Sequence, residues 1–381
     1  MGIFRSIPGI KSIGIIGFGN IAGSAISGLF WIYLASLLGA ENYGELGYYI
    51  SIATIASSVS FLGGPMAITV LTAKKVKIES TVFFTSLFAS LISAVILYFS
   101  FANIGLSIYV LGAVIYNLAT AELLGRKLYK KYSIYFISQK ILFVISSLIL
   151  YYILGPSGVL LGIGLSFLPF VERIYFGFKT TRIDFQLLKT KWKFISNNFF
   201  YDLSHIFERQ IDKLLIGPLF GFTILGNYYL AIQVLTILAV FPEIVTKYTL
   251  PEDASGNNTK KIKLLTVAFS LILASIGVFL VPQFLPIYFP EFTESLDLIP
   301  IISLCIIPTT ISTLYITQFF GNEKSGSIVL ISIISFTILT IGILTLGEIF
   351  GVIGLAYSLL ISDVARALLF FLFTHFKKNS E

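Results

Sequence analysis

The chain has 381 residues, of which 56% are hydrophobic and only 12% are charged, and its mean hydropathy is +0.92. Soluble domains carry about 25% charged residues, so the chain has roughly half of the charge that a water-soluble protein needs. This composition excludes a soluble enzyme, a nucleic-acid-binding module and a disordered scaffold, and it indicates an integral membrane protein. With one cysteine and two histidines, we expect no disulfide framework, no metal site and no cofactor.

Long apolar runs follow one another along the whole chain. A helical span needs about 20 predominantly apolar residues to cross about 30 Å of hydrocarbon, and the sequence contains twelve such runs. An open sheet edge is not tolerated in lipid, and barrel strands are only about ten residues long, so these runs are typical of helices. We therefore predict an all-α polytopic membrane protein with spans at 13–38, 45–73, 82–102, 105–124, 134–154, 157–177, 196–218, 223–246, 262–282, 296–319, 326–346 and 351–373.

Basic residues gather in alternate loops. If the N-terminus, with Arg5 and Lys11, is cytoplasmic, the predicted cytoplasmic segments hold 21 Lys and Arg residues and the outside loops hold none. The outside loops carry acidic residues instead: Glu41, Glu291, Glu294 and Glu348. This bias predicts a multi-pass protein of the cell membrane with both termini in the cytoplasm. It also accounts for the net charge of +7 without a nucleic-acid partner.

Two turns of similar sequence indicate an internal repeat. LLGAENYGELGYY (37–49) resembles LFGFTILGNYYLA (219–231), and both Gly39–Gly221 and Gly44–Gly226 are separated by 182 positions. We predict two parallel six-helix halves, residues 1–178 and 196–381, with a substrate site between them. The sequence of the cytoplasmic linker at 179–195 is equally consistent with an ordinary connection and with an amphipathic stretch on the membrane surface.

The seventh predicted span, ISNNFFYDLSHIFERQIDKLLIG (195–217), is unusually polar. A charge at the bilayer centre costs about 2.5–3.5 kcal/mol on insertion scales, so these groups need water, partners or both. At 100° per residue the polar side chains share one arc of roughly 140°, which predicts a face that lines a cavity between the halves. The alternative is a packed face whose charges neutralise one another. The residues are Asn198, Asp202, His205, Glu208, Arg209, Asp212 and Lys213.

Within this face, Arg209 lies nearest the middle of the span, where a guanidinium suits bidentate binding of a phosphate or pyrophosphate. Asp202 and Asp212 would neutralise it when no substrate is bound. His205 would either titrate near neutral pH and couple transport to protons or serve a structural role. Asn20 is the repeat equivalent of Asp202, so we expect it to face the same cavity.

A few other polar or kinked positions occur inside the spans. Asp363 and Arg366 are three residues apart and are expected to form an ion pair. Glu122 and Lys140 lie near span ends, where we expect both to snorkel toward water. Prolines remove a backbone hydrogen bond and are expected to kink their spans at Pro65, Pro169, Pro242, Pro282 and Pro308.

Enzymatic signatures are missing from the sequence. It contains no G-x-x-x-x-G-K-[ST] phosphate loop, no G-x-S-x-G elbow and no zinc motif. We therefore expect a protein that is not an enzyme, that has no catalytic residues and that does not itself hydrolyse ATP.

The turn LLGAENYGELGYY and the run ERQIDKLLIGPLFGFTILGNYYLA (208–231) resemble the polysaccharide-export flippases of the multidrug/oligosaccharidyl-lipid/polysaccharide exporter superfamily. The resemblance implies a MATE-like fold and alternating access. It also implies transfer of a polyprenyl-(pyro)phosphate-linked oligosaccharide to the outer leaflet for surface polysaccharide biosynthesis. Arg209 and Asp212 match the family's motif positions. The implied partners are lipid-linked oligosaccharide and membrane lipids; a monomer is expected, and association with glycan-assembly enzymes stays open.

Two other functions are consistent with parts of the pattern. A cation-coupled multidrug exporter of the same superfamily would use the acidic groups of the seventh span, although Arg209 and Lys213 stand beside them. A membrane-embedded glycosyltransferase or polymerase would need a sizeable outside loop with catalytic groups, and the longest predicted outside loop, at 283–295, is short.

Overall fold

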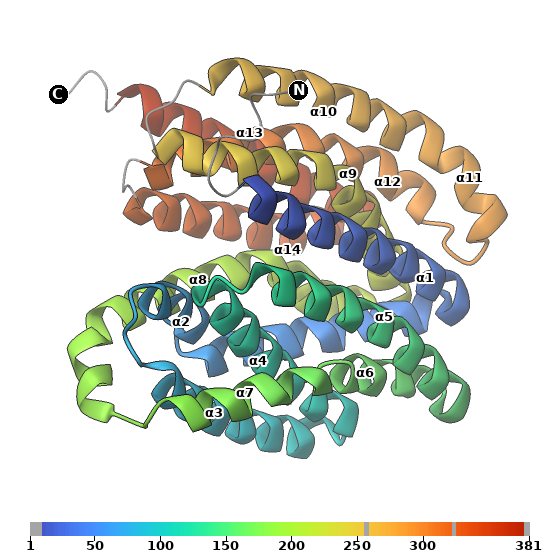
Figure 1. The fold of residues 1–381 in the computed structure, drawn as a ribbon. Helices are drawn as coiled ribbons and strands as arrows, with labels where there is room; N and C mark the ends of the chain where they lie inside the picture. The colour runs from blue at the N-terminus through green and yellow to red at the C-terminus, as the bar shows by residue number, and fades with distance from the viewer. Residues whose placement is uncertain (1–9, 255–258, 322–324, 377–381) are drawn as a thin grey trace. The chain divides into compact units, whose positions relative to one another are not determined.

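The structure is a computed structural model that describes residues 10–254, 259–321 and 325–376. These residues form helices joined by short turns, with no strand among them (Figure 1), as the apolar pattern predicts. The helices are α1 Ile10–Phe61, α2 Gly64–Ala73, α3 Glu79–Phe101, α4 Ile104–Gly125, α5 Tyr129–Leu154, α6 Pro156–Leu165, η2 Leu168–Phe170, α7 Val171–Thr180, α8 Phe185–Phe220, α9 Phe222–Ala254, α10 Lys260–Ser275, η3 Ile276–Leu280, α11 Val281–Tyr288, α12 Ser295–Leu304, α13 Ile306–Gly321 and α14 Ser325–Phe376.

Helix lengths agree with twelve spans. Among the described residues, nine helical stretches are long and apolar enough to cross a membrane. Two of them lie in α1 and α14, which have 52 residues each and would be about 78 Å long if straight, more than twice the thickness of the hydrocarbon core. Each of these helices contains one non-helical glycine, Gly39 or Gly351, and is long enough to cross a membrane twice. The charged helix α8 adds the remaining span.

The described contacts divide the chain into two compact units. Unit 1 comprises residues 1–30 and 49–206, and unit 2 comprises residues 31–48 and 207–381. The turn between the first two spans therefore belongs to unit 2, and α8 continues from one unit into the other. The division into halves at 1–178 and 196–381 stays a prediction about the sequence repeat.

The repeated turns adopt matching backbone conformations. Gly39 and Gly221 have φ of 71° and 97°, a region that L side chains rarely adopt and that lets the chain reverse at these points. Five residues further on, Gly44 lies against the carbonyl oxygen of Phe222, and Gly226 lies against that of Ala40. Ala40 and Phe222 are separated by the same 182 positions as the two glycines, so each turn makes the same contact with the other. The two contacts therefore confirm the predicted correspondence of the two turns within unit 2.

A second pair of turns shows the same correspondence, which sequence reasoning missed. Gly155 and Gly351 have φ of 70° and 58°. Three residues later, Gly158 and Gly354 each lie so close to a carbonyl oxygen of the preceding helix that a Cβ atom would collide with it. The sixth and twelfth spans therefore leave their preceding helices through similar close turns.

Most of the predicted proline kinks are present. The helix breaks at Leu62–Gly63 before Pro65, passes through the 3₁₀ turn η2 at Pro169 and takes π geometry in η3 before Pro282. The break before Pro308 separates α12 from α13. At Pro242, α9 continues without a break in the helix, so a kink there stays a prediction. The spans predicted at 45–73, 157–177, 262–282 and 296–319 are therefore each built from more than one helical piece.

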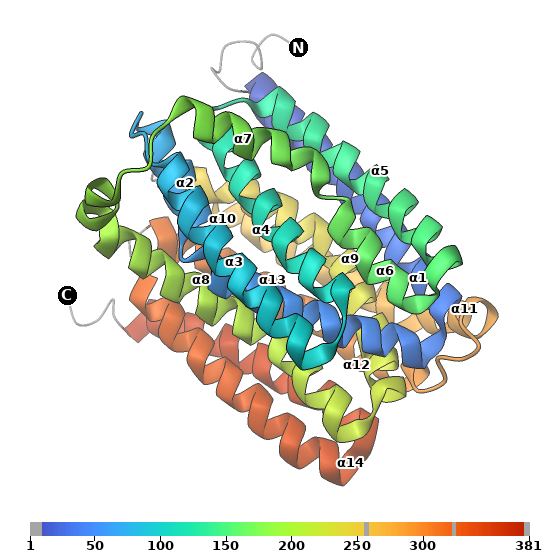
Figure 2. The same ribbon diagram turned by 90° about the horizontal axis from the view of Figure 1, so that it is seen from below.

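The core of unit 1 lies among α2, α3, α4 and α7, where Figure 2 shows α3 beside α4. Phe83, Leu118 and Phe170 are completely buried there. The Ser80 hydroxyl lies 2.6 Å from that of Thr181 and donates to the Gly177 carbonyl at 3.0 Å, which ties the start of α3 to the end of α7. These helices therefore close tightly on one another.

The helix α8 begins directly after Asp184, whose side chain accepts a hydrogen bond from the Leu187 amide at 2.9 Å. This capping interaction satisfies one of the amides that an N-terminus leaves without a partner. Residues 185–195 of the predicted linker thus form the first turns of α8 and continue into the seventh span.

Candidate functional site

A buried polar cluster occupies unit 2, and its first part joins α8 to α9. Asp212 and Lys213 are 4% and 6% exposed, and the Lys213 ammonium donates to Asp212 Oδ1 at 2.8 Å. The same ammonium donates to the Arg209 carbonyl at 2.8 Å, and the Tyr228 hydroxyl donates to Asp212 Oδ2 at 2.9 Å. Both charges are therefore paired and hydrogen-bonded, as groups far from water require.

The second part of the cluster joins α8 to α13 and α14. Arg366 donates to Glu208 Oε1 at 2.7 Å and to Asp363 Oδ1 at 2.5 Å, which confirms the predicted Asp363–Arg366 pair. The Thr309 hydroxyl donates to the other oxygen of Asp363 at 3.0 Å. Glu208 is the residue that connects this pair to the polar face of α8, and no sequence spacing indicates that contact.

The charges of this cluster do not cancel. Glu208, Asp212 and Asp363 are carboxylates, and Lys213 and Arg366 are the cations that pair with them. If all five are ionised, the cluster carries one surplus negative charge, which is costly in a medium of low dielectric constant. One proton or one small cation would neutralise it. No group of three or more His, Cys, Asp or Glu residues with metal-binding geometry occurs among the described residues.

Arg209 lies next to this cluster on α8 but differs from it in environment. Its side chain is exposed, and its guanidinium pairs with no carboxylate among the residues that the structure describes. The neighbouring acids Glu208 and Asp212 pair with Arg366 and Lys213 instead. The predicted neutralisation of Arg209 by Asp212 is therefore not the contact that the structure shows.

The other predicted site residues belong to unit 1. Asp202 and His205 are half-buried on α8, the Asn198 amide donates to the Phe194 carbonyl at 3.0 Å, and Asn20 Oδ1 accepts from the Tyr132 hydroxyl at 3.4 Å. The structure thus brings Glu208, Asp212 and Lys213 into one cluster, whereas the hydrogen bonds of Asn198 and Asn20 join residues outside it. That all eight residues line one cavity stays a prediction.

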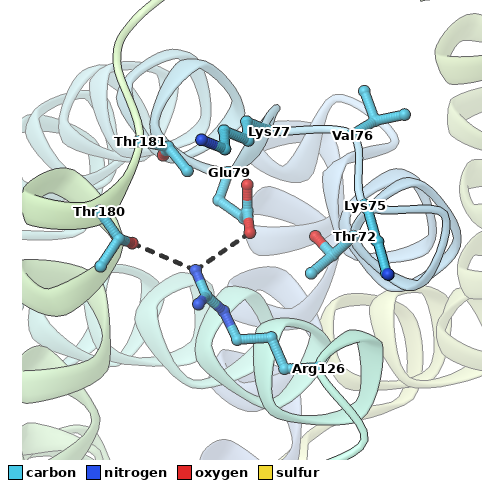
Figure 3. A pocket seen from close by; sticks show the side chains of 8 residues that line it. All are labelled: Thr72, Lys75, Val76, Lys77, Glu79, Arg126, Thr180 and Thr181. Carbon is cyan, nitrogen blue, oxygen red and sulfur yellow. Dashed lines mark hydrogen bonds and ion pairs between the residues drawn. The ribbon is translucent and has the colours of Figure 1, made fainter.

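A second buried cluster, in unit 1, corrects the expectation for Glu122. This carboxylate is completely buried rather than snorkelling, and Arg173 donates to it through Nε at 3.1 Å and Nη2 at 2.7 Å. Arg126 bridges Glu122 to Glu79, and Figure 3 shows it between Glu79 and Thr180. The i,i+4 spacing of Glu122 and Arg126 could have predicted their ion pair from the sequence. Nothing in the sequence indicates the contact between Glu122 and the distant Arg173.

A small cavity of about 220 Å³ lies over this second cluster. Its lining includes Lys75, Lys77, Glu79, Arg126 and Thr180 (Figure 3). Glu79, Glu122, Arg126 and Arg173 together carry no net charge, so the cluster ties α3, α4 and α7 together without leaving a surplus charge. We assign it a structural role.

Comparisons with known proteins identify the fold. No protein-family model matches the chain, and no curated protein matches it either. Solved structures do match over nearly the whole length. One is the inward-facing conformation of a multidrug resistance MATE family transporter of the MOP superfamily, with a TM-score of 0.72, 15% identity, and coverage of 96% of this chain and 95% of that chain.

Two further matches extend the comparison. A MATE transporter of Vibrio cholerae in mutant form gives a TM-score of 0.66 at 13% identity, covering 97% of each chain. A MOP superfamily transporter from Pyrococcus furiosus, whose reversed binding-pocket polarity suggests a different function, gives 0.64 at 15% identity, covering 97% of this chain and 96% of that one. The chain therefore has the all-α fold of the MATE transporters, as the twelve predicted spans and the motif resemblance implied.

Proposed function

We propose that the chain is a secondary transporter that works by alternating access and moves a polyprenyl-(pyro)phosphate-linked oligosaccharide from the cytoplasmic to the outer leaflet, for surface polysaccharide assembly. Support for transport comes from the fold, because solved MATE transporters in both inward- and outward-facing conformations resemble this chain over nearly its whole length. Support for the substrate comes from the sequence motifs around Arg209 and from the environment of that residue.

The exposed guanidinium of Arg209 is the observation that carries the substrate assignment. Its acidic neighbours on α8 pair with Lys213 and Arg366, so neither of them forms a direct ion pair with the Arg209 guanidinium. A planar guanidinium binds two phosphate oxygens at once, which a lysine does not. A lipid-linked pyrophosphate offers that geometry, while its hydrocarbon tail remains in the bilayer. Asp202, His205, Asn198 and Asn20 are proposed to contact the sugar head group.

The experiment uses proteoliposomes that contain a fluorescent polyprenyl-diphosphate sugar, with transfer between leaflets followed by a membrane-impermeant quencher. We expect Arg209→Ala to lower the flipping rate roughly 10- to 100-fold, because it removes charge-assisted hydrogen bonds worth about 1.5–3 kcal/mol. Arg209→Lys should recover only part of the rate, since it keeps the charge and loses the bidentate geometry. Lys193→Ala, an exposed position near the start of α8, is the matched control and should flip normally.

A specific observation also supports a second candidate, a cation-coupled multidrug exporter. The surplus carboxylate charge among Glu208, Asp212 and Asp363 would be neutralised by a proton or a cation taken up from one side. Efflux of a cationic dye that requires a proton gradient, together with no transfer of the lipid-linked sugar, would favour this exporter. A normal flipping rate in Arg209→Ala would instead show that Arg209 does not bind the phosphate, while lipid transport itself would remain supported.

A further inference from the structure

The cavity over the second cluster has more positive charge than the cluster needs. It lies within unit 1 and measures about 220 Å³. The two carboxylates and two guanidinium groups of the cluster cancel one another. Lys75 and Lys77 add two exposed ammonium groups to the lining (Figure 3), and neither forms an ion pair within the part of the chain that the structure describes. The charge of the cavity therefore favours an anion as its ligand.

Two buried polar atoms of the lining residues have no hydrogen-bond partner among the described residues. Glu79 is 3% exposed, and its Oε1 pairs with Arg126 at 3.1 Å, whereas its Oε2 accepts no hydrogen bond. The Thr72 hydroxyl is likewise buried and unpartnered. Figure 3 shows the Glu79 carboxylate between Arg126 and the side chain of Lys77. A buried acceptor without a donor lowers stability, so a ligand that donates to Oε2 removes this cost.

Lys75 has an unusual backbone conformation directly after α2. Its φ is 61°, in the left-handed region where glycine is the usual residue after a helix. The amides of Lys75 and Val76 each donate to a carbonyl of the last turn of α2 at 2.9 Å, which completes a Schellman motif. Glycine would make the same turn at a lower conformational cost. Lysine at this position therefore lowers stability, which points to a separate contribution of its side chain.

The end of α4 has the same turn without a cavity beside it. Lys127 has a φ of 58°, and the amides of Lys127 and Leu128 donate to carbonyls of α4 at 2.9 and 2.8 Å. Lys127 is exposed like Lys75, but it does not line the cavity. The two lysines therefore share a backbone conformation and a position at a helix end, and they differ in whether they adjoin the cavity.

We propose that this cavity binds the phosphate ester of a small polyol. The phosphate binds to the ammonium groups of Lys75 and Lys77, and a hydroxyl of the polyol donates to Glu79 Oε2 and pairs with the Thr72 hydroxyl. Because Lys77 is exposed and forms no ion pair with a described residue, its side chain turns toward the phosphate and gives the polyol access to Oε2. The cavity is smaller than the about 300–1,000 Å³ of pockets for drug-sized molecules, so it suits a ligand of this size.

Other small ligands satisfy only one part of the cavity. Inorganic phosphate supplies negative charge for the two lysines, but it places an anion beside the unpartnered carboxylate oxygen of Glu79. A neutral polyol donates to that oxygen and leaves both ammonium groups without a counter-charge. A metal cation would be repelled by Lys75, Lys77 and Arg126. A polyol phosphate satisfies both parts.

Two sources supply this chemistry: a soluble polyol phosphate, and the head group of a phospholipid such as phosphatidylglycerol. The charge bias of the loops predicts that Lys75 and Lys77 lie on the cytoplasmic side, where both sources occur. The cavity shares no residue with the contacts proposed for the transported lipid-linked oligosaccharide. Its test is therefore independent of the outcome for Arg209.

The test is isothermal titration of the full chain in a neutral detergent, with glycerol 1-phosphate as the probe. Ethyl phosphate, which has no hydroxyl group, should bind roughly tenfold less tightly. Lys75→Gly should lower the affinity for glycerol 1-phosphate roughly tenfold, because a charge-assisted hydrogen bond is lost. The same variant should raise the unfolding temperature, because glycine relieves the left-handed turn. Lys127→Gly is the matched control and should raise the unfolding temperature without changing the affinity.

Thr72→Val tests the hydroxyl contact separately, because valine keeps the shape of threonine and removes its hydroxyl. We expect it to weaken glycerol 1-phosphate roughly threefold and to leave ethyl phosphate unchanged. Bilayer discs then distinguish the two sources. If phosphatidylglycerol lowers the binding of glycerol 1-phosphate more than phosphatidylcholine does, the site takes lipid head groups; equal binding in both discs assigns it to the soluble ester.

Three results would overturn the proposal. One is that ethyl phosphate or inorganic phosphate binds as tightly as glycerol 1-phosphate. Another is that Lys75→Gly binds glycerol 1-phosphate like wild type. The third is that Lys127→Gly weakens binding as strongly as Lys75→Gly, which would trace the effect to the helix-end turn rather than to the cavity.

Discussion

At the scale of single residues, Arg366 has the largest number of ionic partners in the unit 2 cluster, since it pairs with both Glu208 and Asp363. Arg366→Met leaves two buried carboxylates without a cation, and breaking buried pairs in this way costs about 3–5 kcal/mol. Glu208→Gln leaves Arg366 paired with Asp363, so we expect a smaller loss of about 1 kcal/mol. Unfolding of the purified variants in detergent, followed by circular dichroism, measures the order of the two effects.

The double variant Glu208→Gln/Arg366→Met provides the control for this prediction. Removing the carboxylate together with its cation should recover part of the stability lost in Arg366→Met, because one unpaired charge fewer is buried. Equal losses in Glu208→Gln and Arg366→Met, with purely additive effects in the double variant, would contradict the cluster as described.

The sequence reveals the candidate site only where the interacting residues are close along the chain. The polar arc of α8 and the Asp363–Arg366 pair follow from helical spacing, and both are present. The link from Glu208 to Arg366 spans 158 residues and depends on how α8 packs against α14. The contact between Glu122 and Arg173 likewise joins residues that are far apart in the sequence, so it could not be predicted. For this reason the expectation that Glu122 reaches water was wrong.

At the scale of helices, apolar length predicts which segments span and glycine predicts where they turn, but helix continuity depends on backbone details that hydropathy does not carry. Helices α1 and α14 each continue through their turn with a single non-helical glycine. Pro169 and Pro308 interrupt their spans, whereas Pro242 lies inside an unbroken α9. A proline kink requires local relaxation of the helix, and that relaxation is set by the neighbouring helices.

The close contact at the repeated turn gives a prediction for Gly44. A Cβ atom at this position would collide with the Phe222 carbonyl oxygen, a backbone atom that a rotamer change does not move. We expect Gly44→Ala to destabilise unit 2 by about 1–3 kcal/mol, the usual cost of overpacking. Gly17→Ala in the same helix is the control, because nothing lies within 4 Å of its new Cβ atom, and alanine favours helix there. A lower unfolding temperature for Gly17→Ala than for Gly44→Ala would contradict the close contact.

At the scale of the whole molecule, the direction of the proposed transport depends on which ends of the spans face the cytoplasm. The fold alone does not fix that direction, since the same bundle inserted upside down keeps every internal contact. The distribution of Lys and Arg over the loops predicts it, because translocation of basic loops is disfavoured. The proposed direction of transport, from the cytoplasmic to the outer leaflet, follows from this one assignment.

Cysteine labelling in intact cells tests the assignment, and the chain is well suited to it because its only cysteine, Cys305, is completely buried. Lys75→Cys and Glu348→Cys place thiols at exposed positions in loops that are predicted to lie on opposite sides. A membrane-impermeant maleimide should label Glu348→Cys in intact cells and should label Lys75→Cys only after the membrane is permeabilised. Wild type should stay unlabelled in both conditions. The reverse pattern would invert the topology and turn the proposed flippase into an importer, because a substrate entering from the lysine-rich end would then start in the outer leaflet.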